Sequence, residues 1–315
     1  MKKFRRFKLI YELYNIVNYK RLKYQLPLYK KYNLKKSYYQ SLSSLDFPSI
    51  SEHETPWLDH LDSQIFLPQD PGFQTLDKES KEAILNWSDE GFAILKGFFN
   101  SDIVDTVNTL LSKLIEDKKL RLKEGRKYMF AVRYSDQIKA LANPKKLTDI
   151  VDLLMGRPAD LFQSVNFLKG SEDPAHSDFI HMSTYPYGYL IAVWIALEDI
   201  NEDNGPLFYY PGSHKLPYMM NKDFSHGGNK WLLGKNYKKE YTKKIESVLQ
   251  DNNFEKKVFT AKKGDVLIWH ANLLHGGSPV IDQLKTRKSM VLHYFGRDVI
   301  RYHEITERPC LLDIN

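Results

Sequence analysis

The sequence predicts a mainly β fold with flanking helices, in which several short strands form a sandwich or barrel. After residue 160 the chain consists of short apolar segments separated by turn residues, among them YLIAVWIAL at 189–197 and SMVLHYFGR at 289–297. Before residue 160 the apolar residues recur at helical spacing instead. The 315 residues are 42% hydrophobic, enough for one sizeable core with additions.

Three helices are expected ahead of the strands. In the first, 76–91, an apolar side formed by Ile84, Leu85 and Trp87 precedes Gly91, which is placed to end the helix. The second, 101–123, begins at Ser101 or Asp102 as N-cap, and the third, 143–156, ends at a glycine. A short strand, GFAILKGFF, separates the first two.

The strands begin with RPADLFQSVNFLKG at 157–170. Its alternation puts Leu161, Gln163, Val165 and Phe167 on one face. The insert at 217–256 interrupts the strands, is rich in lysine and contains a helical stretch, YKKEYTKKIESVLQ. A long insertion between strands is where a lid over a barrel mouth would lie, so a lid is expected here.

Composition limits the kind of protein and its location. A single cysteine, Cys310, excludes a disulfide framework and a multi-cysteine zinc site, and fits a reducing cytoplasm. The sequence has no apolar run of about 18 residues, so no membrane span is expected. The basic N-terminus is not typical of a signal peptide, because Glu12 and Asn15 interrupt its apolar part. The expected location is cytoplasmic, with peripheral membrane contact as an open alternative.

The positive charge is concentrated at the N-terminus. Residues 1–45 hold twelve Lys or Arg and one acid, a net charge of +11, so the total of +7 leaves −4 for the remainder. This tyrosine-rich extension could pack an apolar stripe on the body, lie on an anionic membrane or dock on a partner. Nucleic-acid binding is the least supported use, because no recognised motif accompanies the charge. Residues 46–75 are expected to be a linker, and 76–315 the main domain.

A metal site is indicated by His176-Ser177-Asp178. On an extended segment the His and the Asp point to the same side, which supplies two of the three ligands of a facial triad. The strongest candidate for the third ligand is His275, which follows an apolar strand and precedes two glycines that permit close backbone approach. Arg287 then begins another apolar strand, where a buried guanidinium needs an anion. The other candidate histidines are His181, His214, His226, His270, His293 and His303.

Several pieces together resemble the phytanoyl-CoA dioxygenase (PhyH) family of Fe(II)- and 2-oxoglutarate-dependent oxygenases. They are the H-x-D triplet, VWIALEDINEDNGPLFYYPGSH at 193–214, GDVLIWH at 264–270, HGGS at 275–278 and Arg287, in the family's order across 76–300. Two departures are Ser177, where the family often has Gln, and an added glycine before Ser278.

The resemblance implies a double-stranded β-helix core, the cupin-like jelly roll. It implies Fe(II) bound by His176, Asp178 and His275, with 2-oxoglutarate and O₂ as co-substrates. The far carboxylate of 2-oxoglutarate would pair with Arg287. Ser278, Trp194 and Lys169 match further co-substrate positions of the family, whereas Trp269 is expected to be a core aromatic.

The expected function is therefore that of a dioxygenase. It would hydroxylate an unactivated carbon of a small-molecule or carrier-linked substrate and release succinate and CO₂. The lysines of the insert hint at an anionic substrate, and the carboxylate of Asp178 favours hydroxylation over halogenation. Two alternatives stay open: a cupin-like metal-binding jelly roll, such as an isomerase or sensor, without 2-oxoglutarate chemistry, and a non-catalytic protein docked through its basic tail.

Overall fold

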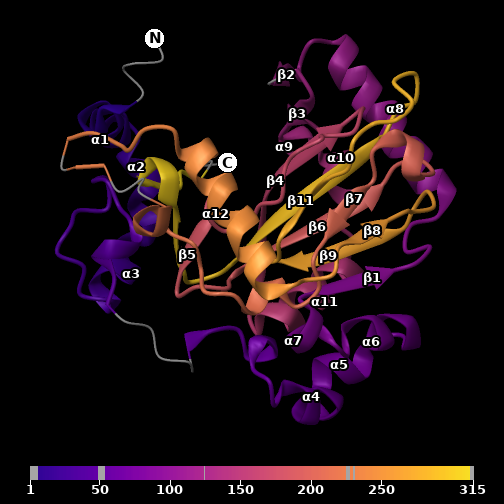
Figure 1. The fold of residues 1–315 in the computed structure, drawn as a ribbon, viewed down its shortest axis with the longest axis horizontal. Coiled ribbons are helices and arrows are strands. Elements are labelled where there is room, and N and C mark those ends of the chain that lie inside the picture. Colours follow the sequence, from indigo (N-terminus) through magenta and orange to yellow (C-terminus); the bar gives the residue numbers. More distant parts are fainter. Residues whose placement is uncertain (1–5, 49–53, 124, 225–227, 230, 313–315) are drawn as a thin grey trace.

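The structure, a computed structural model, describes residues 6–48, 54–123, 125–224, 228–229 and 231–312 (Figure 1). Its largest element is an antiparallel sheet of seven strands in the order β1-β9-β6-β11-β4-β3-β2. The bounds of these strands, in that order, are Phe92–Leu95, Val266–His270, Leu190–Ala196, Ser289–Gly296, Ala159–Phe167, Lys127–Met129 and Leu122–Lys123.

Two smaller antiparallel sheets complete the β structure. One has the order β10-β7-β8, with bounds His275–Gly277, Leu207–Tyr209 and Lys257–Phe259. The other has the order β13-β12-β5, with bounds Arg308–Pro309, Ile300–His303 and Ser183–Tyr185. The first of these packs on the large sheet through a shared apolar core. This arrangement confirms the predicted mainly β jelly roll with flanking helices.

The position of strand β6 in the fold explains why its sequence is apolar throughout. Ala192, Trp194 and Ala196 face the core between the two sheets, where Leu207 and Phe259 meet them. The alternate residues, such as Val193, face the opposite side, where helices cover the sheet. Because both faces of the strand are buried, no polar residue interrupts it.

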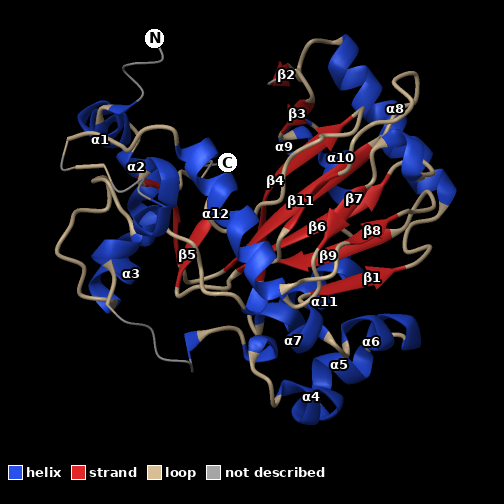
Figure 2. Cartoon of the chain, in the orientation of Figure 1, coloured by secondary structure: helices blue, strands red, loops and turns tan. Residues whose placement is uncertain are grey.

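Helices α8 (Ser101–Glu116), α10 (Asp136–Ala142) and α11 (Lys145–Met155) cover the outer face of the large sheet (Figure 2). The N-cap of α8 is Asn100 and not the expected Ser101 or Asp102, because the Asn100 side chain accepts the N–H of Ile103. The predicted ends at Gly91 and Gly156 are confirmed, and both adopt the left-handed conformation that suits glycine, with φ of 74° and 64°.

The segment expected to be a linker folds into short helices from residue 54 onward. Leu58, Leu67 and Phe73 are buried in the core beneath the large sheet. Helices of four or five residues, such as α4 (Ser63–Phe66) and α5 (Pro71–Thr75), show too little periodicity to be recognised in a sequence. The helix expected over 76–91 is present as two shorter ones, α6 (Lys78–Ile84) and α7 (Trp87–Glu90), and a further short helix, α9 (Ala131–Tyr134), precedes α10.

The N-terminal extension forms helices α1 (Lys8–Val17), α2 (Tyr19–Leu22) and α3 (Leu26–Lys31). Its buried residues Leu28, Tyr29 and Leu42 join a core with residues of β5 and β12, so the extension packs on the body. Helix α12 (Tyr237–Asn252) of the insert lies between the extension and the large sheet (Figure 1). Within the described residues, no helix combines the length and hydropathy needed to cross a bilayer.

Candidate active site

Two histidines almost a hundred residues apart are joined by their backbones. His176 and His275 form an isolated antiparallel bridge, in which the N–H of each donates to the carbonyl of the other at 2.9 Å. The chain turns directly after His176, so the expected extended segment is reduced to this one bridge. Asp178 lies in that turn, and one ligand atom from each of the three residues falls within 4.8 Å of the other two. Among the described residues, no other group of His, Cys, Asp or Glu meets this criterion.

The hydrogen bonds of both histidines fix the tautomer that a metal needs. The Nδ1 of His176 lies 2.8 Å from the carbonyl of Pro174, and the Nδ1 of His275 lies 3.0 Å from that of Leu273. A carbonyl oxygen can only accept, so each Nδ1 carries a proton, and in the neutral ring Nε2 keeps its lone pair. These second contacts orient the two rings as metal-ligating histidines are usually oriented.

Asp178 is buried and held by an indole. Trp269 Nε1 donates to its Oδ2 at 2.9 Å, and the Nε2 atoms of His293 and His275 lie 3.6 and 3.7 Å from the same oxygen. Burial alone would raise the pKa of Asp178, but the neighbouring His275 and His293 outweigh it and hold that pKa well below its usual range. Burial lowers the pKa of His275 to about 4. The resting forms are thus a carboxylate and a neutral imidazole, both ready to bind a cation.

The three residues open onto a cavity of about 710 Å³. Its floor comes from alternate residues of the large sheet, with Gln163 and Val165 on β4 and Val291 and His293 on β11. Helix α12 supplies a wall through Tyr237, Lys238, Tyr241 and Thr242. The Tyr241 hydroxyl accepts the N–H of Ser177 at 3.0 Å, which ties the insert to the backbone between His176 and Asp178.

Arg287 lines the same cavity and is only 3% exposed. Its Nη1 donates to Ser289 Oγ at 3.1 Å, its guanidinium lies over the ring of Phe167, and its Nε has no hydrogen-bond partner in the described part of the chain. Burial lowers the pKa of Arg287 to about 10, against the opposing effect of Asp173 and Glu198, so it is charged at neutral pH. A buried cation without a carboxylate partner is suited to bind an anion.

Of the three remaining residues suggested for the co-substrate, one lines the cavity and two do not. Trp194 lines the cavity, and its Nε1 is buried without a partner among the described residues. Ser278 has a buried Oγ with no hydrogen-bond partner in the part of the chain that the structure describes, but it is not among the residues that line the cavity. Lys169 is exposed and donates to the carbonyl of Gln283 at 3.1 Å, away from the cavity.

The other candidate histidines are spread over the fold. His181, His293 and His303 line the cavity but are outside the three-residue group. Burial lowers the pKa of His181 to about 3 and that of His303 to about 4. His214 and His270 lie elsewhere, with His270 Nε2 3.0 Å from Asp59 Oδ2. His226 lies outside the described residues.

Sequence reasoning missed the contacts that Trp269, Ser289 and His293 make in the site. Trp269 was expected to be a core aromatic, and that interpretation is incomplete because its indole donates to Asp178. Ser289 and His293 lie two and six residues after Arg287 on strand β11, so strand alternation could have placed them on its face.

Comparisons with known proteins agree on one family. The family model of phytanoyl-CoA dioxygenase (PhyH) matches residues 87–283, more than half of the chain. Peroxisomal phytanoyl-CoA dioxygenase of Rattus norvegicus is 28% identical over 148 residues, which cover 46% of this chain and 38% of that protein. Phytanoyl-CoA dioxygenase domain-containing protein 1 of Danio rerio is 33% identical over 85 residues, covering 26% and 29%. The chain thus matches well under half the length of these relatives.

Solved structures share the fold. The non-haem alpha ketoglutarate dependent carbocyclase SnoK from nogalamycin biosynthesis superposes with a TM-score of 0.59 at 15% identity, over 77% of this chain and 96% of that one. EctD from S. alaskensis with bound Fe gives 0.54 at 20% identity, over 70% and 77%. At this identity the likeness establishes the jelly-roll fold.

Proposed function

Because the chain belongs to the phytanoyl-CoA dioxygenase family, we propose that it is an Fe(II)- and 2-oxoglutarate-dependent dioxygenase. Its reaction would hydroxylate an unactivated carbon of a small-molecule or carrier-linked substrate. The products would be the hydroxylated substrate, succinate and CO₂. The proposal draws on the His176, Asp178 and His275 group, on the cavity in front of it and on Arg287 within that cavity.

The donor set fits iron. Two imidazoles and one carboxylate are the facial ligands that non-haem Fe(II) oxygenases use, and the cavity would leave the remaining positions open to 2-oxoglutarate and O₂. Bound iron would supply the oxidation, with one oxygen atom of O₂ entering the substrate and the other entering succinate as 2-oxoglutarate loses CO₂. The protein's part is to orient the ligands, bind the co-substrate and exclude water.

Within that division, each neighbouring residue has a distinct task. Trp269 would hold one oxygen of Asp178 through its indole N–H, leaving the other oxygen for the metal. Tyr241 would close α12 over the cavity through its hydrogen bond to Ser177, which keeps bulk water from the site. Trp194 would pack beside 2-oxoglutarate, because it lines the cavity from the central strand β6.

The observation that carries the proposal is Arg287. A guanidinium buried in a metal-site cavity without a carboxylate partner among the described residues needs an anion. The far carboxylate of 2-oxoglutarate supplies one with matching bidentate geometry. A metal-binding jelly roll without 2-oxoglutarate chemistry would have no use for this residue. Ser278 and Lys169 remain predictions for the same carboxylate, and Ser289 is a better placed hydroxyl because it already contacts Arg287.

The substrate side of the cavity favours an anionic molecule. Arg126, Lys127 and Lys238 line it, while its acids are Asp178 and Asp173, the latter paired with Arg126 at 3.1 Å. This positive excess would attract a carboxylate or a phosphate carried by the substrate.

We also propose a reducing, cytoplasmic location with peripheral membrane contact through residues 1–45, which the single cysteine and the basic extension fit.

The test is succinate formation by the purified protein. The protein would be incubated with Fe(II), 2-oxoglutarate and fractions of a metabolite extract, and the products followed by mass spectrometry. We expect iron-dependent succinate and a product that has gained one oxygen atom. Succinate without an oxygenated product would place another oxidative outcome ahead of hydroxylation. Neither succinate nor 2-oxoglutarate binding across the fractions would contradict the proposal.

A further inference from the structure

Helix α1 of the extension packs on the body through its polar face and exposes its apolar face to solvent. Its polar residues Lys8, Glu12 and Asn15, spaced four and three apart, face the body, and Asn15 is 1% exposed. Its apolar residues face solvent, with Leu13 55% and Val17 82% exposed. The other exposed apolar residues of this helix are Leu9, Ile10, Tyr14 and Ile16. An amphipathic helix that packs on a globular body normally shows the opposite arrangement.

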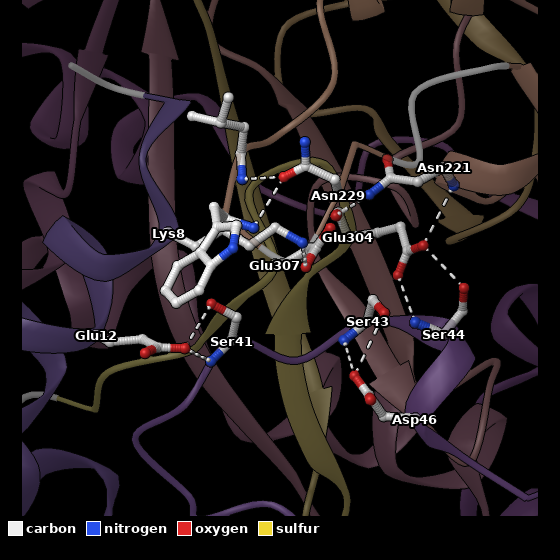
Figure 3. Close-up of polar contacts among 12 residues, drawn as sticks. Lys8, Glu12, Ser41, Ser43, Ser44, Asp46, Asn221, Asn229, Glu304 and Glu307 are labelled. Atoms are coloured by element: carbon white, nitrogen blue, oxygen red, sulfur yellow. Dashed lines mark hydrogen bonds and ion pairs between the residues drawn. The ribbon is translucent and has the colours of Figure 1, made fainter.

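Specific contacts hold α1 in this orientation. Lys8 Nζ lies 2.6 Å from Glu307 Oε2, and Glu12 Oε1 accepts from both the N–H and the hydroxyl of Ser41 (Figure 3). Asn15 Nδ2 donates to the carbonyl of Tyr39 at 2.9 Å. Rotating the helix to bury its apolar side would break all of these contacts and leave Glu307 buried without Lys8. The apolar face is therefore presented outward by the fold.

The exposed apolar surface continues onto the insert. Phe7, just before α1, is 44% exposed and forms a bridge with Leu232, and the N–H of Lys8 donates to the carbonyl of Trp231 at 3.0 Å. Trp231 is itself 63% exposed. An exposed tryptophan and phenylalanine beside an aliphatic helix face are typical of a surface that enters the interfacial region of a bilayer.

The net charge of the extension indicates which partner this face would bind. The extension carries +11 against −4 for the remainder of the chain. Exposed Lys20, Lys23 and Lys30 follow α1, and four more basic residues precede it in the sequence, at Lys2, Lys3, Arg5 and Arg6. From this combination we infer that α1 and Trp231 form a peripheral docking surface for an anionic lipid bilayer. The apolar side chains would enter the interface while the lysines contact the lipid headgroups.

A second copy of this chain fits the surface poorly. A helix of ten residues is roughly 15 Å long and about 10 Å wide, a strip far smaller than the roughly 800 Å² per partner of a stable interface. A symmetric dimer through α1 would also bring two +11 extensions together. The inference specifies the membrane contact proposed above for residues 1–45 and uses no residue of the active site, so it and the proposed dioxygenase activity can fail separately.

Flotation of full-length protein with lipid vesicles tests the inference. Vesicles of phosphatidylcholine alone would be compared with vesicles that also contain phosphatidylserine, at low and high salt. We expect binding to the anionic vesicles, little binding to neutral ones and a marked loss at high salt.

A matched pair of double variants isolates the apolar face. Leu13→Ser with Val17→Ser should weaken vesicle binding at least about tenfold. Ile281→Ser with Leu284→Ser removes similar side chains, 71% and 95% exposed, from a distant loop and should leave binding unchanged. Circular dichroism would confirm that both variants are folded, as expected for changes at exposed positions.

Three outcomes would overturn the inference. The first is equal binding to neutral and anionic vesicles. The second is equal loss of binding in the two double variants. The third is absence of vesicle binding. Sedimentation would then distinguish a monomer from a dimer that dissociates in the variant Leu13→Ser with Val17→Ser. The dimer would assign the face to a second copy, and a monomer without vesicle binding would leave it to a protein partner.

Discussion

Replacing Arg287 with methionine should separate co-substrate binding from folding. Methionine fills a similar volume without charge. Burial lowers the pKa of Arg287 to about 10, which corresponds to about 3 kcal/mol by which the site disfavours the charged form relative to water. Removing the charge therefore stabilises the folded protein by about 3 kcal/mol. Losing the hydrogen bond to Ser289 destabilises it by about 1 kcal/mol. The ligand-free variant should therefore be about 2 kcal/mol more stable than the wild-type protein.

Binding of 2-oxoglutarate should change in the opposite direction. Loss of one partner of a buried charge pair costs at least about 2 kcal/mol, so the dissociation constant for 2-oxoglutarate should rise about 30-fold or more. Calorimetric titration of the iron-loaded protein measures it, and urea unfolding of the ligand-free protein measures stability. Arg297→Met, at an exposed arginine paired with Asp160, is the control and should bind 2-oxoglutarate normally. Unchanged 2-oxoglutarate affinity in Arg287→Met would refute the assignment of the anion site.

Three further predictions concern the metal ligands and the buried histidines. Asp178→Ala should reduce the iron content to background, because two imidazoles alone bind iron weakly; iron content equal to wild type by elemental analysis would contradict the triad. Trp269→Phe should lower iron affinity about tenfold in a chelator competition, while Trp194→Phe should not, since only the Trp269 indole N–H contacts a ligand; equal effects would contradict that role. Burial holds the pKa values of His214 and His303 at about 3 and about 4, so below about pH 6.5 the unfolded chain binds protons that the folded chain does not. The free energy of unfolding should thus fall by about 1.4 kcal/mol per pH unit for each histidine as the pH drops from about 6 to 4; urea unfolding that is flat across this range would contradict it.

Much of the fold is predictable because it depends on local patterns. Strand β6 is a continuous apolar run since both of its faces are buried, and helix α11 is marked by its spacing and by Gly156. The short helices between residues 54 and 75 could not be predicted, because four or five residues are too few to show a helical repeat of apolar positions. Their burial depends on contacts with distant helices, as Trp57 shows by donating to the carbonyl of Leu153.

The metal ligands of the site could be predicted because they lie in recognisable sequence motifs. The H-x-D triplet and the glycines after His275 mark His176, Asp178 and His275 as candidates, the family resemblance supports the same three, and the structure brings them together through a backbone bridge. The contact of Trp269 with Asp178 joins residues 91 positions apart and has no local signal. The role of Lys169 stays a prediction, because β4 ends at Phe167 and strand alternation no longer decides where the following lysine points.

Helix α1 shows a limit of periodicity itself. An apolar stripe at helical spacing identifies an amphipathic helix but not which side meets the body. That side is decided here by Glu307, Ser41 and Tyr39, whose groups pair with the polar residues of the helix. Only the folded chain reveals that the stripe is exposed.

The most direct test of the central claim is the fate of isotopically labelled O₂. The iron-loaded protein would turn over 2-oxoglutarate under labelled O₂ in the presence of a substrate-containing fraction, with Asp178→Ala as the baseline. The proposed dioxygenase chemistry predicts one labelled oxygen atom in succinate and one in the hydroxylated product for each 2-oxoglutarate consumed. Succinate no higher than in Asp178→Ala, or succinate without label, would contradict the claim that this cavity is an iron and 2-oxoglutarate site.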